Sequence, residues 1–147
     1  HEAVRFHGFL PQQDCAAQLL RCDALVLGSL RECGGAVVLE ALAMGLPVIA
    51  SNWGGPRDTV TPEDGILVDP TPHDSFAARQ ARAIATLAQD PARARQMGAA
   101  GAARMRDEFD WEHKVDQIEA LYQRAMGRTG TRPVITATDP GQFGRAS

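Results

Sequence analysis

The sequence of 147 residues predicts an α/β fold built on a parallel sheet. Short apolar segments bounded by turn residues alternate with longer segments in which apolar residues recur every three or four positions. The apolar segments lack polar alternation, which is typical of strands that are buried on both faces of a parallel sheet. Strand–helix–strand alternation is the pattern of βαβ units. We therefore expect a sheet of about four parallel strands, followed by helices at the C-terminal end.

The first half of the chain is expected to supply all the strands. They are expected at residues 4–8, 24–27, 47–50 and 65–68. Helical spacing of apolar residues predicts connecting helices at residues 12–22 and 36–44, with a short helical piece at 57–60. Gly45 follows the second of these helices and is expected to end it, because glycine is common just after the last helical turn.

The second half of the chain is expected to be helical. Three helices are predicted there, at residues 76–89, 91–106 and 111–126. The last of them carries an apolar stripe formed by Val115, Ile118, Leu121 and Tyr122. Residues 127–147 are rich in Gly and Pro and show no sustained period, so we expect a disordered tail there after an ordered part at residues 1–126.

Charge and composition exclude several classes of partner. With 15 basic and 18 acidic residues and a net charge of −3, the chain lacks the basic balance of nucleic-acid-binding domains, so no nucleic acid partner is expected. Arg79, Arg82, Arg93, Arg95, Arg104 and Arg106 make the long helices locally basic. Interleaved acidic residues indicate a solvated face, and membrane contact by this part of the protein is not expected. No apolar run approaches the roughly 20 residues of a membrane span.

The cysteines and the first residues bear on location and completeness. Cys15 and Cys22 on one helix would lie about 10.5 Å apart, beyond the roughly 7 Å limit for a disulfide. Cys33 is alone, and an odd count without a framework favours a cytoplasmic location. A longer parent protein is expected to be cytoplasmic or peripheral at the inner face of the membrane. The chain begins without a Met or a secretory signal, so we expect it to be a fragment.

The segment from Ser29 to Ala50 carries the candidate chemistry. It joins a predicted strand to a predicted helix through Gly34 and Gly35, which places the start of the helix at the carboxyl end of the sheet. Free N–H groups and the helix dipole favour phosphate there, and glycines let a ligand approach the backbone. Glu32 and Glu40 bracket this turn, and carboxylates accept hydrogen bonds from sugar hydroxyls. The arrangement suits a nucleotide sugar.

Glu32 and Glu40 form an E-x7-E motif, and the sequence around it resembles the retaining family 4 glycosyltransferases. The resemblance covers about 125 residues and rests on seven landmarks in order. They are residues 4–8, the motif, 45–50, Trp53-Gly54-Gly55-Pro56, 65–68, Phe109-Asp110-Trp111 and Leu121-Tyr122. It implies a GT-B architecture of two Rossmann-like domains. Residues 1–126 would be a partial C-terminal donor-binding domain, and the acceptor domain of the same enzyme would be missing.

The resemblance also implies roles for individual residues. Glu40 would bind the ribose hydroxyls, and Glu32, the catalytic candidate, would bind hydroxyls of the transferred hexose. Backbone groups of Cys33, Gly34 and Gly35 would face the sugar and the pyrophosphate, beside the Ser29 hydroxyl. Gly54 and Gly55 rank second, as rim residues. The family retains anomeric configuration without an agreed enzymic nucleophile, so neither glutamate is assigned that role. No D-x-D pair occurs, and neither a metal nor another cofactor is expected.

The chain departs from the family pattern near the motif. Gly28 stands where the family often has Pro, and the segment Cys33-Gly34-Gly35 lacks an aromatic residue that is frequent there. The family's Arg and Lys that neutralise the diphosphate would precede position 1. In the usual 3-2-1-4-5-6 sheet order, two further strands would separate the strand at 4–8 from the next strand of this chain, and these two strands are missing. We therefore expect the chain alone to bind donor weakly and to be inactive.

Other interpretations of the same residues remain open. Glu32 and Glu40 could be a solvated loop acid and a helix acid, Ser29 a turn residue, and Cys33 a small packing residue. The whole chain could be a nucleotide- or partner-binding module without turnover, or part of a GT-B sugar-nucleotide epimerase. A dehydrogenase is disfavoured because no G-x-G-x-x-G follows a strand.

Overall fold

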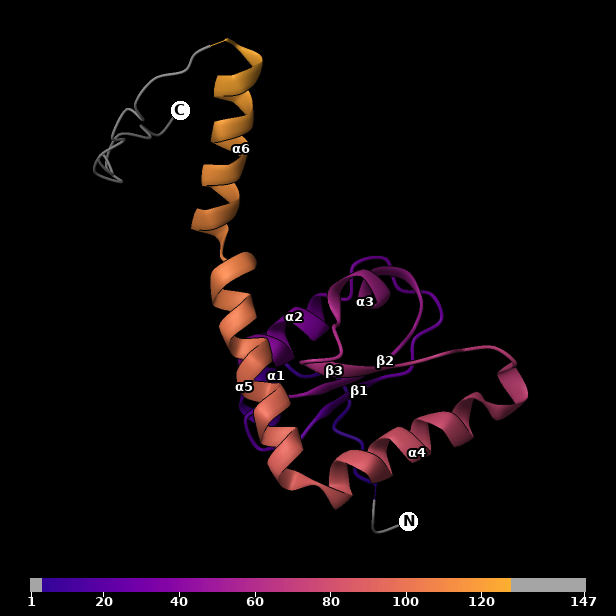
Figure 1. Ribbon diagram of the computed structural model, residues 1–147. Coiled ribbons are helices and arrows are strands. Elements are labelled where there is room, and N and C mark those ends of the chain that lie inside the picture. The colour runs from indigo at the N-terminus through magenta and orange to yellow at the C-terminus, as the bar shows by residue number, and fades with distance from the viewer. Residues whose placement is uncertain (1–3, 128–147) are drawn as a thin grey trace, which may run out of the picture.

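The computed structural model describes residues 4–127, which form a three-stranded parallel sheet with helices around it (Figure 1). The strands are β1 (Leu25–Leu27), β2 (Val48–Ser51) and β3 (Gly65–Val68), and they lie side by side in chain order. All pairs are parallel, with Leu25 opposite Val48 and Val48 opposite Gly65. The predicted α/β class is confirmed, with three strands in place of the four expected.

Helices cover both faces of this sheet. The helices of the described chain are α1 (Gln12–Leu19), α2 (Ala36–Ala43), α3 (Gly54–Thr59), α4 (Phe76–Gln89), α5 (Pro91–Glu108) and α6 (Trp111–Ala125), with a short 3-10 helix, η1 (His73–Ser75), before α4. In Figure 1, α2 and α3 lie on one face and α4 on the other, while α5 packs against α2 and α6 extends away from the sheet. The carboxyl ends of the strands carry the loops at 28–35, 52–53 and 69–72, and α5 lies toward their amino ends.

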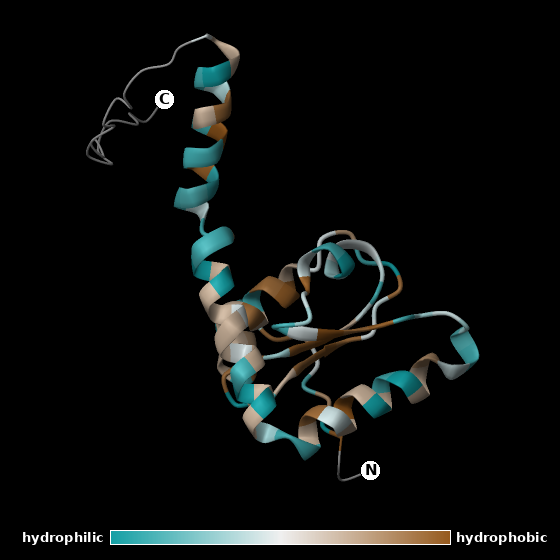
Figure 2. Ribbon diagram, viewed as in Figure 1, coloured by the Kyte–Doolittle hydropathy of each residue, from teal (hydrophilic) through white to brown (hydrophobic). Residues whose placement is uncertain are grey.

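The core consists of two apolar clusters separated by the sheet. One is centred on Val38 and Leu42 of α2 and includes Met105 of α5. The other joins Ile49 of β2 to Leu87 of α4 on the opposite face. Every residue of β2 is buried, because this strand has a neighbour on each side and helices above and below. Figure 2 shows the same arrangement, with hydrophobic residues gathered on the strands and α2.

A buried ion pair fixes α5 across the amino ends of β2 and β3. Asp64 is 1% exposed and accepts at Oδ2 from Nε of Arg104 at 2.8 Å, while its Oδ1 accepts from the Thr61 N–H at 2.9 Å. The guanidinium also donates to the Thr59 carbonyl and lies over the Phe109 ring. The expectation that Arg104 belongs to a solvated basic face is therefore wrong. Its partner lies 40 residues away, which the local pattern does not show.

The predicted strand at residues 4–8 is wrong. This segment is irregular, and Phe6 is 92% exposed. A strand needs a hydrogen-bonding neighbour, and nothing in the described part of the chain pairs with this segment. The apolar sequence of β1 predicts burial on both faces, but Val26 is 43% exposed. Within residues 4–127, β1 pairs with β2 alone and forms an edge of the sheet.

Several helix predictions need smaller corrections. Helix α1 ends at Leu19, so Cys15 and Cys22 do not share one helix, although all three cysteines are free. Helix α3 begins at Gly54, ahead of the predicted 57. The apolar stripe of α6 is exposed in this structure, because α6 touches the rest of the described chain mainly near its start.

No helix within residues 4–127 is both long and apolar enough to cross a membrane. The predicted disordered tail lies outside the described residues, apart from Gly127.

Candidate functional site

The loop at 28–35 connects the carboxyl end of β1 to the start of α2, as the sequence predicts. Gly35 is the N-cap of α2 and has a φ of +66°, a left-handed conformation that favours glycine. The Glu32 carboxylate turns back toward the helix, and its Oε1 accepts a hydrogen bond from the Gly35 N–H at 3.0 Å. A carboxylate at this position is also favoured by the positive end of the helix dipole. Glu32 is thus held, half-buried, at the amino end of α2.

Gly34 leaves open space in this turn. A methyl group built on Gly34 would meet no atom within 4 Å, whereas one on Gly35 would lie 3.1 Å from Pro56. Cys33, the next residue, is exposed. The backbone at 33–34 is therefore accessible to a ligand from solvent, which anion binding at a helix start requires.

Glu40 lies one turn further along α2 and is exposed. Its carboxylate makes no hydrogen bond or ion pair with any of residues 4–127. Glu32 and Glu40 therefore differ in their surroundings. The structure joins Glu32 to the turn of Gly34 and Gly35 and leaves the carboxylate of Glu40 free for a ligand.

A second loop packs directly on the first. Gly54 and Gly55, at the start of α3, lie so close to the backbone of residues 32–34 that a methyl group on Gly55 would be 2.5 Å from the Cys33 carbonyl oxygen. The buried Ser51 hydroxyl at the end of β2 donates to the Ser29 carbonyl. The Ser29 hydroxyl itself accepts from the Arg31 N–H at 3.4 Å. The sequence places Gly54 and Gly55 on the rim of the crevice, and the structure puts them against the motif loop.

Two arginines near these loops were not singled out by the sequence reasoning. Arg31 directly precedes Glu32, and its guanidinium has no hydrogen-bond or ion-pair partner among residues 4–127. Arg57 on α3 is exposed, and its Nε lies 3.5 Å from Oδ1 of Asp58. The position of Arg31 directly before the motif was the one feature of the sequence that would have identified it as a candidate site residue. No group of three or more potential metal-ligating side chains occurs within the described residues.

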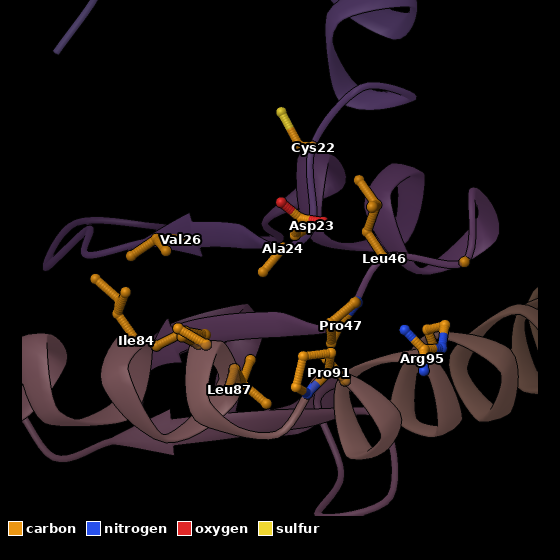
Figure 3. Close-up of a pocket in the computed structure, with 14 residues that line it drawn as sticks. Cys22, Asp23, Ala24, Val26, Leu46, Pro47, Ile84, Leu87, Pro91 and Arg95 are labelled. Atoms are coloured by element: carbon orange, nitrogen blue, oxygen red, sulfur yellow. The ribbon is translucent and has the colours of Figure 1, made fainter. Parts of the chain in front are cut away.

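A cavity of about 600 Å³ lies elsewhere, beside β1 and toward the amino ends of the strands. Figure 3 shows Val26 of β1 facing Ile84 and Leu87 of α4 across this space, with Pro91 and Arg95 of α5 at its side. Its lining is mainly apolar and includes none of the predicted site residues. The cavity and the motif loop are therefore separate features of the molecule.

Comparison with known proteins gives these features a family context. The family model described as "Glycosyl transferases group 1" matches residues 1–104. A GDP-mannose-dependent monoacylated alpha-(1-6)-phosphatidylinositol monomannoside mannosyltransferase of Corynebacterium glutamicum is 34% identical over 127 residues, which are 82% of this chain and 32% of the relative. A glycogen synthase of Mycobacterium tuberculosis is 37% identical over 84% of this chain and 29% of its own length.

The structural comparison agrees with the sequence comparison. The sucrose-phosphate synthase of Thermosynechococcus elongatus superposes with a TM-score of 0.72 at 36% identity, covering 86% of this chain and 31% of that protein. The chain thus spans about a third of the length of these relatives. The resemblance to GT-B glycosyltransferases, first indicated by the motif and its flanking landmarks, is confirmed. The chain belongs to the group 1 glycosyltransferase family.

Proposed function

We propose that this chain is the donor-binding half of a retaining, metal-independent glycosyltransferase. The longer parent enzyme would transfer a hexose-type sugar from a nucleoside diphosphate sugar to an acceptor held by its other domain. The observation that carries this proposal is the motif loop, where a carboxylate, an accessible glycine backbone and a helix start lie together at the carboxyl end of β1. The GDP-mannose dependence of one relative supports a hexose donor.

Each part of the loop has a chemical role in this proposal. The donor diphosphate would approach the backbone at Cys33, Gly34 and Gly35, where the helix dipole favours negative charge. The Glu32 carboxylate would leave the Gly35 N–H and accept hydrogen bonds from the transferred sugar, while the exposed Glu40 would accept from the ribose. The unpaired Arg31 could offset the charge of the diphosphate.

The remaining parts of the proposal have separate grounds. Retention of anomeric configuration follows the family resemblance, the lack of a metal requirement follows from the absence of a D-x-D pair, and a cytoplasmic location follows from the odd cysteine count. The chain by itself is expected to bind donor weakly and to transfer nothing, because the acceptor domain and the upstream basic residues would belong to the rest of the parent.

The proposal is tested by kinetics on the parent enzyme. Incubation with a panel of nucleoside diphosphate sugars should yield a glycosylated acceptor with one donor and no requirement for added divalent cation. Epimerised donor without transfer would support the epimerase alternative, and nucleotide binding without either product would support a binding module. Glu40→Ala should raise the donor KM through lost ribose contacts. The matched control is Glu63→Ala, which removes an exposed carboxylate before β3 and should leave the donor KM unchanged.

A further inference from the structure

Trp53 occupies a distinctive position on the rim of the motif loop. It is the N-cap of α3 and directly precedes Gly54 and Gly55, whose backbones touch residues 32–34. Its own N–H donates to the Ser51 carbonyl at 2.8 Å, which ties its backbone to the end of β2. The backbone of Trp53 is therefore fixed at both ends, beside the carbonyl of Glu32.

Trp53 is 54% exposed in spite of this anchored backbone. The loops that follow the strands, at 28–35, 52–53 and 69–72, contain no other Phe, Tyr or Trp. Cys33, Gly34 and Gly35 offer almost no side chain at the floor of the site. Leu30 in loop 28–35 is also partly exposed, at 39%, but it has no flat face on which a sugar ring could stack. A ligand lying on that floor therefore has one aromatic surface available from these loops, the ring of Trp53.

We propose that Trp53 is the stacking platform for the transferred sugar, an inference that rests on the function proposed above. The carbon-bound hydrogens of one pyranose face are slightly positive and match the negative face of an indole, while the hydroxyls around the ring need hydrogen-bond acceptors. Glu32 supplies such an acceptor, and the close approach of Gly54 to the backbone carbonyl of Glu32 brings the backbone of residue 53 near that of Glu32. Sugar binding thus combines an aromatic surface from the β2 loop with a carboxylate from the β1 loop.

This assignment makes Trp53 a determinant of donor specificity. An aromatic platform favours a sugar that presents a continuous apolar face, and it discriminates among hexoses that differ in the orientation of one hydroxyl. In the proposed arrangement the ribose lies at Glu40 on α2, and the nucleotide is expected to make no contact with Trp53. A change at Trp53 should therefore alter the affinity for the sugar donor and leave the affinity for the free nucleoside diphosphate unaltered.

The test compares Trp53→Ala and Trp53→Phe in the parent enzyme, using its sugar donor as substrate and the matching nucleoside diphosphate as competitive inhibitor. Trp53→Ala should raise the donor KM roughly three- to tenfold, the loss expected for one stacked ring, with little change in kcat. Trp53→Phe, which keeps an aromatic face, should stay within about twofold of the wild type. The inhibition constant of the nucleoside diphosphate should be the same in all three proteins.

Trp111→Ala is the matched control, since it truncates the chain's other tryptophan, on α6. It should leave the donor KM unchanged. If Trp53→Ala fails to fold, Trp53→Leu keeps apolar bulk without the aromatic face and should show the same rise in KM. An unchanged donor KM, or an equal loss for donor and nucleoside diphosphate, would overturn the platform assignment while leaving the proposed function intact. Absence of transfer by the wild type with every donor would instead refute the proposed function.

Discussion

The contact between Gly55 and the motif loop allows a quantitative prediction for Gly55→Ala. The added methyl group would lie 2.5 Å from the Cys33 carbonyl oxygen and 2.6 Å from the carbonyl carbon of Gly34, whereas ordinary contacts begin near 3.4 Å. The obstructing atoms are backbone, so no side-chain rotation can relieve the overlap. Loop 28–35 and the start of α3 must therefore separate by roughly 1 Å, a shift that a close-packed interior resists.

This displacement should affect both stability and activity. Overpacking of this kind costs about 1–3 kcal/mol of unfolding free energy. A shift of about 1 Å in a substrate-positioning loop can lower turnover by roughly a hundredfold. We expect Gly55→Ala to lower the urea midpoint of the chain and to reduce kcat/KM of the parent enzyme by at least tenfold.

Gly34→Ala provides the matched comparison for Gly55→Ala. Its methyl group meets no atom within 4 Å, so the unfolding free energy should stay within about 0.5 kcal/mol of the wild type. It should still weaken donor binding, because the methyl group would occupy the space through which a ligand reaches the backbone. Urea unfolding of the chain and donor KM of the parent enzyme separate the two effects. A Gly55→Ala variant as stable and as active as the wild type would contradict the close packing of α3 on loop 28–35.

Three further predictions concern stability, measured by urea unfolding of the chain. Arg104→Ala should cost about 3–5 kcal/mol, because Asp64 would be left as a buried carboxylate without its cation; a loss below 1 kcal/mol would contradict this. Gly98→Ala should cost at least about 1–3 kcal/mol, since its methyl group would collide with the Gly45 carbonyl where α5 crosses the end of α2. Asp90→Ala should cost about 1 kcal/mol through loss of the N-cap of α5, and no change would show that this cap is dispensable.

The sequence predicted much of the fold because the decisive interactions there are local or periodic. The apolar run that forms β2 and the glycine that ends α2 mark element boundaries within a few residues. Helices α4 and α5 were predicted in the same way, from apolar spacing and from Pro91 in the first turn. These features need no knowledge of distant residues.

The predictions that the structure contradicts concern interactions that are not local, because they depend on partners that are remote in the sequence. Residues 4–8 alternate like a strand, but a strand exists only beside another strand. The stripe on α6 has the period of a buried face, yet nothing in the described part of the chain covers it. Likewise, no local pattern connects Arg104 to Asp64.

The candidate site shows the same division. The motif and the glycine pair predicted where a ligand would approach, and the structure places them at the carboxyl end of β1, next to Gly54 and Gly55. The hydrogen bond from the Gly35 N–H to Glu32 was not predictable, since it depends on the conformation of the irregular backbone between residues 32 and 35. Nor did the sequence show that Trp53 stays exposed beside this loop.

The most direct test of the central claim is an NMR titration of the isotope-labelled chain with a nucleoside diphosphate and with its hexose conjugate. Even weak binding shifts amide signals, so the low affinity expected of the chain alone is no obstacle. We predict that the largest shifts fall on residues 33–36, with smaller ones at Trp53, and that the Gly35 signal changes as Glu32 releases its N–H. Shifts confined to the cavity between β1 and α4, or none at millimolar ligand, would contradict a donor site at the motif loop.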